Sequence, residues 1–150
     1  MTFSFGVGAG TYDRTAMVST IKESYPKTNS RLAAKVVELS ISLTKGTVFT
    51  PVDILALISV ESGFDPKARN SRSRGLMQVK GGSYDVEINM RQGVALLVDY
   101  HEQLGSKDAA TKAYNVGITR YKATGAGGGY LSKVKAERKR FKHRTGKGKS

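Results

Sequence analysis

Apolar residues recur at helical intervals along much of the chain and predict a mainly helical protein. Over residues 30–44, four of them share one face of a predicted helix: Leu32, Val36, Leu39 and Leu43. A second helix is predicted to begin at "TPVD", residues 50–53, where a threonine cap, a proline and an aspartate form a capping-box pattern. This helix is expected to end at Glu61 or Ser62, just before a glycine.

Three further helices are predicted in the second half of the chain, over residues 89–104, 106–114 and 130–141. The strand signal is limited to one short hairpin near residues 76–84. The expected fold class is therefore mainly α, in one helical domain over residues 30–141 with a short β-hairpin or loop.

The two ends of the chain show weaker patterns. Residues 1–29 are rich in Gly, Ser and Thr and are predicted to form an N-terminal arm, with one short helix near residues 15–24. Residues 142–150 are predicted to be a basic flexible tail. The first residues lack the basic and apolar regions of a signal peptide, so we expect a soluble protein without that export signal and without a transmembrane segment.

The composition limits the chemistry that this domain can support. The 150 residues include no cysteine and two histidines, His101 and His143, so neither a disulfide framework nor a zinc cluster is expected, and no cofactor or metal is predicted. The net charge is +13, and residues 133–150 hold nine Lys or Arg against one acid, which gives +8 of that total. An anionic partner is predicted, such as nucleic acid, an anionic membrane or an acidic wall polymer.

Glu61 has an unusual position at the end of an apolar helix. Helical spacing places it on the same face as Leu57 and Ile58, and the C-terminal helix dipole disfavours a further negative charge there. Both effects should raise the pKa of Glu61, as a general acid requires. The residues leave an alternative open, in which Glu61 turns outward and pairs with an arginine of the next loop: Arg69, Arg72 or Arg74.

Five short motifs follow one another between residues 48 and 141: "ESGFDPKA", "GLMQV", "NMRQG", "KAYNVG" and "GYLSKV". In order and approximate spacing they resemble the catalytic domain of soluble-type lytic transglycosylases, which are relatives of goose-type lysozyme. The resemblance implies a mostly helical, α+β lysozyme-like domain with a short β-hairpin or loop at the cleft. It also implies that this domain cleaves the β-1,4 bond between N-acetylmuramic acid and N-acetylglucosamine in peptidoglycan.

The resemblance also implies roles for individual residues. Glu61 resembles the sole catalytic acid/base, and the residues that resemble substrate-binding positions are Ser62, Gln78, Tyr114, Asn115 and Tyr130. Four of the substrate-binding positions have a structural alternative. Ser62 and Asn115 suit helix ends, Gln78 suits a solvent-facing turn, and Tyr130 suits the core.

The chain departs from the family pattern at two places near these motifs. The loop over residues 68–75 is one residue short, so the substrate-binding serine of the family maps onto Asn70 or Ser71. Lys80 stands where a methionine is frequent, and its cation could meet peptide-stem or lactyl carboxylates. Because a cation beside Glu61 would lower the pKa of that acid, we expect Lys80 to point along the cleft.

A single acid implies a particular reaction. Ordinary glycosidases use two carboxylates, whereas Glu61 alone would protonate the leaving oxygen and then deprotonate the 6-hydroxyl of the muramic acid, which closes on C1. The alternatives are a muramidase on the same fold and a basic structural virion or DNA-binding protein with a relic fold. The expected setting is a bacteriophage virion or host lysis, acting on the wall in the periplasm. The expected partners are peptidoglycan glycan strands, other virion proteins through the arm or tail, and DNA by non-specific contact.

Overall fold

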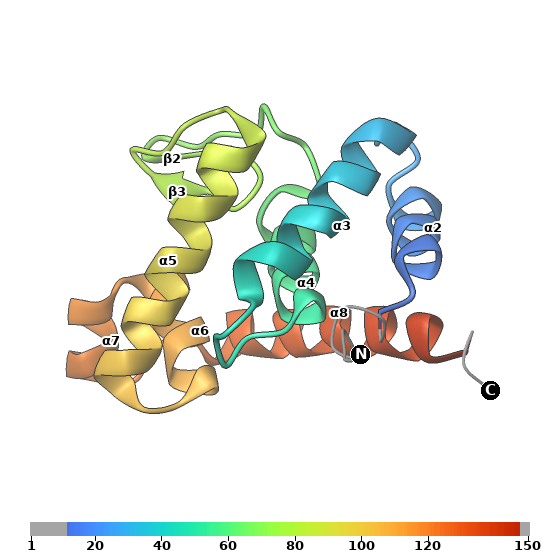
Figure 1. Ribbon diagram of the computed structural model, residues 1–150. Helices are drawn as coiled ribbons and strands as arrows, with labels where there is room; N and C mark the ends of the chain where they lie inside the picture. The colour runs from blue at the N-terminus through green and yellow to red at the C-terminus, as the bar shows by residue number, and fades with distance from the viewer. Residues whose placement is uncertain (1–11, 148–150) are drawn as a thin grey trace.

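The computed structural model describes residues 12–147 and is dominated by helices that surround one central helix (Figure 1). In chain order the elements are α2 (Arg14–Ser24), α3 (Ser30–Thr44), α4 (Pro51–Ser62), β2 (Ser73–Arg74), β3 (Val79–Lys80), α5 (Val86–Leu104), α6 (Lys107–Val116), α7 (Ile118–Thr124) and α8 (Gly128–Lys147). The predicted fold class, mainly α and lysozyme-like with a small antiparallel hairpin, is confirmed.

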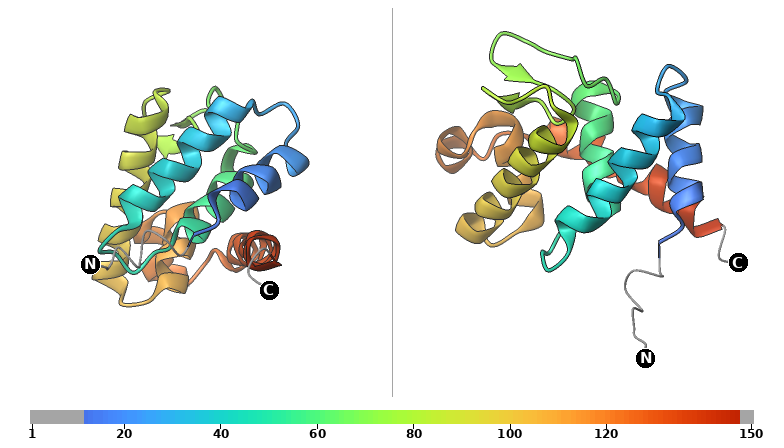
Figure 2. Two further views of the ribbon diagram at one scale, coloured as in Figure 1. Left: turned by 45° about the vertical axis from the view of Figure 1, so that its right-hand side comes forward. Right: turned by 45° about the horizontal axis from the view of Figure 1, so that its top comes forward.

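Helix α4 forms the centre of the core. A continuous run of its residues is buried, listed here from the start of the run: Asp53, Ile54, Leu55, Ala56, Leu57, Ile58 and Ser59. A helix that is apolar on nearly all sides must be covered on nearly all sides. Helix α3 packs on α4, and α8 runs along one side of the molecule in contact with α2, α4 and α6 (Figures 1 and 2).

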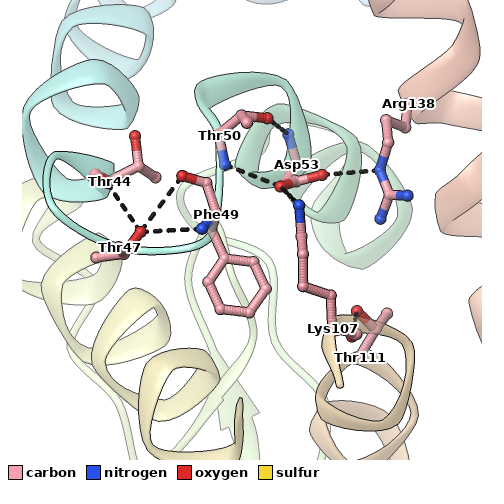
Figure 3. Close-up of polar contacts among 8 residues, drawn as sticks. All are labelled: Thr44, Thr47, Phe49, Thr50, Asp53, Lys107, Thr111 and Arg138. Atoms are coloured by element: carbon pink, nitrogen blue, oxygen red, sulfur yellow. Dashed lines mark hydrogen bonds and ion pairs between the residues drawn. The ribbon is translucent and has the colours of Figure 1, made fainter. Parts of the chain in front are cut away.

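The start of α4 has the predicted capping box. The Asp53 N–H donates to Thr50 Oγ1 at 3.2 Å, and the Thr50 N–H donates to Asp53 Oδ2 at 2.8 Å. Figure 3 shows that the same carboxylate also meets two cations, with Lys107 Nζ at 2.6 Å and Arg138 Nε at 2.8 Å. One carboxylate therefore ties the start of α4 to α6 and α8.

The hairpin lies earlier in the chain than predicted. Ser73 pairs with Lys80 and Arg74 with Val79, so the turn covers residues 75–78. The predicted hairpin, residues 76–84, would have placed the turn near residue 80. The reason is a contact from α5. The buried Asn89 donates through Nδ2 to the carbonyl of Arg74 at 2.8 Å and accepts from the Met77 N–H at 2.8 Å. This side chain fixes the register of the turn.

The structure corrects the prediction of an arm for residues 12–29. Helix α2 contributes Met17 and Ile21 to the core, with exposed fractions of 1% and 0%, and packs against α3 and α8. Residues 1–11 of the predicted arm lie outside the described residues. The tail is also corrected, because α8 continues as a helix to Lys147 and only residues 148–150 lie outside the described range.

Several helix details also differ from the prediction. The buried apolar residues of α3 are Ala33, Val36, Val37 and Ile41, whereas the expected Leu32, Leu39 and Leu43 are half-buried. Helix α5 begins three residues early, because the Asp85 side chain accepts from the Ile88 N–H and caps it. Helix α7 was not predicted. Among the described residues, no helix combines the length and apolarity needed to cross a membrane.

Candidate active site

The backbone after Glu61 is held in an unusual conformation. Helix α4 ends at Gly63 with φ 59°, and Phe64 follows with φ 63°, a left-handed conformation that is costly for a side chain of this size. Phe64 is 2% exposed, and its ring lies 5.2 Å from the Tyr25 ring and 6.2 Å from the Phe141 ring. Aromatic packing thus stabilises the turn that sets the direction of the last helical residues, Glu61 among them.

Glu61 is half-buried. Burial raises the pKa of Glu61 from 4.5 to about 7, and a hydrogen bond from Tyr130 opposes this shift by stabilising the carboxylate. In that bond Tyr130 Oη donates to Glu61 Oε2 at 2.5 Å. The carboxyl can therefore exchange a proton near neutral pH, as its expected position on an apolar helix face predicted. The alternative partners, the arginines of the next loop, are not the groups that set its pKa.

Tyr114 approaches the same place from α6. Its hydroxyl donates to the carbonyl of Met77 at 2.6 Å, which joins α6 to the hairpin turn. The pKa of Tyr114 is raised well above 10 by burial first and then by the charge of Glu61. Burial and Glu61 also raise the pKa of Tyr130. The structure therefore brings together Glu61, Tyr114 and Tyr130 from three different helices, with both tyrosines kept as neutral donors.

Two predicted site residues have side chains engaged in local structure. Gln78 has φ 50°, and its Nε2 donates to the carbonyls of Ala68 at 2.9 Å and Gly75 at 2.8 Å, which closes the loop before the hairpin. Ser62 Oγ donates to the carbonyl of Ile58 at 3.2 Å, one turn back in its own helix. The helix-end alternative thus describes the contact of Ser62. Gln78 lies in a turn, but its side chain is half-buried and bonded to the backbone and does not face solvent as its alternative expected.

The remaining predicted residues are exposed. Asn115 is the neighbour of Tyr114 on α6, while Asn70 and Ser71 lie in the loop before β2, and Lys80 ends the hairpin. Asn70 Oδ1 accepts from the N–H groups of Arg72 and Ser73 at 2.9 and 2.8 Å. Lys80 is not one of the two influences on the pKa of Glu61, which are burial and Tyr130.

Sequence reasoning gave no role to Asn89, which positions Met77 and through it Tyr114. The motif "NMRQG" contains this residue, and its place in that motif was the available signal. Phe64 was missed in the same way, because its role depends on rings from α8 and from the segment after α2.

The acids that follow Glu61 in the sequence are used in local structure. Asp65 Oδ1 accepts from the Lys67 N–H at 2.9 Å, Asp85 caps α5, and Glu87 pairs with Arg91 at 2.8 Å. Among the residues that the structure describes, no three His, Cys, Asp or Glu side chains gather as metal ligands would.

The site combines, in a mainly helical fold, a carboxyl whose pKa is about 7 with two half-buried tyrosines, and this arrangement suits acid–base chemistry. The family model described as Transglycosylase SLT domain matches residues 38–136. The chain therefore belongs to the transglycosylase SLT domain family, and this membership supports lytic transglycosylase activity on peptidoglycan. No curated protein and no solved structure matches the chain.

Proposed function

We propose that this protein is a peptidoglycan lytic transglycosylase that cleaves the bond between N-acetylmuramic acid and N-acetylglucosamine and forms 1,6-anhydro-N-acetylmuramic acid. In this proposal Glu61 is the sole catalytic acid/base. The observation that carries the proposal is the half-buried Glu61, whose pKa of about 7 lets it donate and accept a proton at one pH.

The reaction uses the two protonation states of Glu61 in turn. Protonated Glu61 donates to the glycosidic oxygen as the bond from that oxygen to C1 breaks. The resulting carboxylate then takes the proton of the 6-hydroxyl, whose oxygen forms the new bond to C1 of the same sugar. Water is not consumed, and the carboxyl returns to its protonated form. The N-acetyl group of the muramic acid steadies the positive charge at C1 in place of a second carboxylate.

The hydrogen bond from Tyr130 supports the second half of this cycle. It reaches Oε2 of Glu61 and stabilises the charged form, so the carboxylate persists long enough to act as a base. We assign the proton transfer to the other oxygen, Oε1.

We propose that the substrate lies along the surface beside Glu61 and Tyr130 and reaches the hairpin turn, to which the Tyr114 hydroxyl is bonded. The residues assigned to its binding are Ser62, Asn70, Ser71, Gln78, Lys80, Tyr114, Asn115 and Tyr130. For Ser62 and Gln78 the assignment is indirect, since their side chains shape the turns that flank Glu61.

A muramidase on the same fold would need a second carboxylate to orient water. The local engagement of Asp65, Asp85 and Glu87 argues against that role for each of them. The single-acid mechanism is therefore the reading that the site supports best.

The direct test is Glu61→Gln, which keeps the shape of the side chain and removes its proton. We expect clearing of a peptidoglycan suspension to fall by about 100-fold or more, with an unchanged helical circular dichroism spectrum. Glu102→Gln on the exposed face of α5 makes the same chemical change away from the site and should clear normally. Unimpaired clearing by Glu61→Gln would show that the assignment of the acid is wrong.

We extend the proposal to a phage protein, borne in the virion or acting at lysis on the periplasmic wall. Its support is the +13 charge, which suits polyanionic partners, and a cysteine-free chain that folds without oxidation. Antibody detection in purified particles of the phage that encodes the chain tests this setting, and detection only outside particles would remove the virion role. A DNA-binding relic is the alternative, and gel shifts at graded salt would show it.

A further inference from the structure

The loop that leads into the hairpin carries a cationic cluster for which the structure of residues 12–147 shows no ion pair. Arg69, Arg72 and Arg74 are exposed, and with Asn70 and Ser71 they line a hollow of about 290 Å³. The ion pairs found in the described residues all lie elsewhere, on other arginines and lysines. Three arginines of like charge that line one hollow favour an anionic ligand there, because it would offset their mutual repulsion.

The backbone of this loop is held in place by hydrogen bonds on both sides. The Asn70 N–H donates to Ser73 O at 3.0 Å, and the Gly75 N–H donates to Ala68 O at 2.8 Å. The Gly81 N–H donates to Arg72 O at 2.9 Å, which ties the loop to the residue after β3. A ligand that binds here does not need to order the backbone, which lowers the entropic cost of binding.

The cluster is also connected to the candidate active site. The Gln78 side chain bridges the two parts, because its Nε2 donates to Ala68 O next to the cluster while the preceding residue, Met77, accepts the Tyr114 hydroxyl. Arg74 pairs with Val79 across the hairpin, and its guanidinium lies 5.7 Å from the centre of the exposed Tyr84 ring. A polymer that reaches Glu61 would therefore present its nearby substituents to the arginine loop.

We infer that the arginine loop, defined by Arg69, Arg72 and Arg74, binds carboxylates of the peptide stems that hang from the glycan strand. Guanidinium groups bind carboxylates through two parallel hydrogen bonds, and the stems are the anionic groups that the substrate itself brings beside the cleaved bond. The inference rests on the proposed function for its substrate. It adds a specificity: strands with peptide stems should bind better than bare strands.

The test measures binding without cleavage. Full-length protein with Glu61→Gln is titrated against fluorescent glycan strands of three kinds: with stems, without stems, and with stem carboxylates converted to amides. The variant Arg69→Gln with Arg72→Gln is compared with the unchanged loop. Arg74 is left in place because of its contact with Tyr84. Arg31→Gln with Lys35→Gln on the exposed face of α3 removes the same charge elsewhere.

With the unchanged loop, we expect strands with carboxylate stems to bind roughly fivefold more tightly than the other two kinds at 0.15 M salt, the gain expected from two exposed charge-assisted contacts. The Arg69 and Arg72 variant should lose this preference and keep its affinity for bare strands. The α3 control should retain the preference.

Two results would overturn the inference: a preference that survives in the loop variant, or an equal loss of affinity for all three kinds of strand. A loop variant that loses only DNA binding in a gel shift would also overturn it and would assign the arginines to nucleic acid. Because no cleavage is measured, failure here leaves the transglycosylase proposal standing. Failure of the Glu61 activity test likewise leaves the binding preference as a separate result.

Discussion

The hydrogen bond between Tyr130 and Glu61 makes a directional prediction about pH. Tyr130 Oη donates to Glu61 Oε2 at 2.5 Å and stabilises the carboxylate, so it holds the pKa of Glu61 below the value that burial alone would give. A Tyr130→Phe substitution keeps the ring and removes this donor. The pKa of Glu61 must then rise above about 7.

The size of the rise follows from the difference between two hydrogen bonds. A bond to a charged acceptor contributes about 1.5–3 kcal/mol and one to a neutral acceptor about 0.5–1.5 kcal/mol, so the carboxylate loses roughly 1–1.5 kcal/mol more than the acid. This difference corresponds to an upward shift of about one pH unit. The alkaline limb of the rate profile reports loss of the catalytic proton, and it should move upward by that amount.

The assay is the initial rate of glycan cleavage from pH 5 to 9 at constant ionic strength. Tyr121→Phe on α7 removes a tyrosine hydroxyl away from Glu61 and should leave the limb unchanged. Carboxyl carbon NMR of labelled Glu61 gives an independent reading of the same pKa. An alkaline limb that stays in place or moves downward in Tyr130→Phe would refute the reasoning.

Two further predictions concern stability. Because the folded state raises the pKa of Glu61 from 4.5 to about 7, ionisation destabilises the fold progressively as pH rises between those values. Glu61→Gln should therefore raise the free energy of unfolding by roughly 1–3 kcal/mol at pH 8, seen as a higher Tm, and change it little at pH 4. Equal effects at both pH values would contradict the assignment of this pH dependence to the ionisation of Glu61. Asp53→Asn leaves Lys107 and Arg138 without their counter-charge. Because Asp53 is only 6% exposed, this change should lower the free energy of unfolding, measured in urea, by roughly 2–3 kcal/mol. The exposed pair offers the matched control, since Asp108→Asn should cost less than about 1 kcal/mol, and equal losses would show that burial of Asp53 is unimportant.

The parts of the fold that local chemistry determines could be predicted from the sequence. The cap at Thr50 and the stop at Gly63 depend on residues a few positions apart, so the bounds of α4 were predicted closely. Helix α2 was identified as a short helix, but its place in the core was not. Two apolar residues, Met17 and Ile21, are too few to predict a buried helix face when the partners on α3 and α8 are not known.

In the candidate site, too, features set by neighbouring residues could be predicted, whereas features set by distant residues could not. The raised pKa of Glu61 follows from its position on an apolar helix and could be predicted. Its contact with Tyr130 joins residues 69 positions apart, and no spacing rule connects them. The register of the hairpin depends on Asn89, a single buried amide on another helix, which explains why the expected turn was displaced.

The central claim is that Glu61 acts alone and that the 6-hydroxyl of the substrate replaces water. A hydroxyl held on the same ring has a high effective molarity and should outcompete water at C1. The most direct measurement is mass spectrometry of the fragments released from purified sacculi by the full-length protein. Products that end in 1,6-anhydro-N-acetylmuramic acid, lighter by one water than the hydrolysis product, are predicted. Fragments that end mainly in reducing N-acetylmuramic acid would contradict the single-acid mechanism and make Asp65, Asp85 and Glu87 candidates for a second catalytic carboxylate.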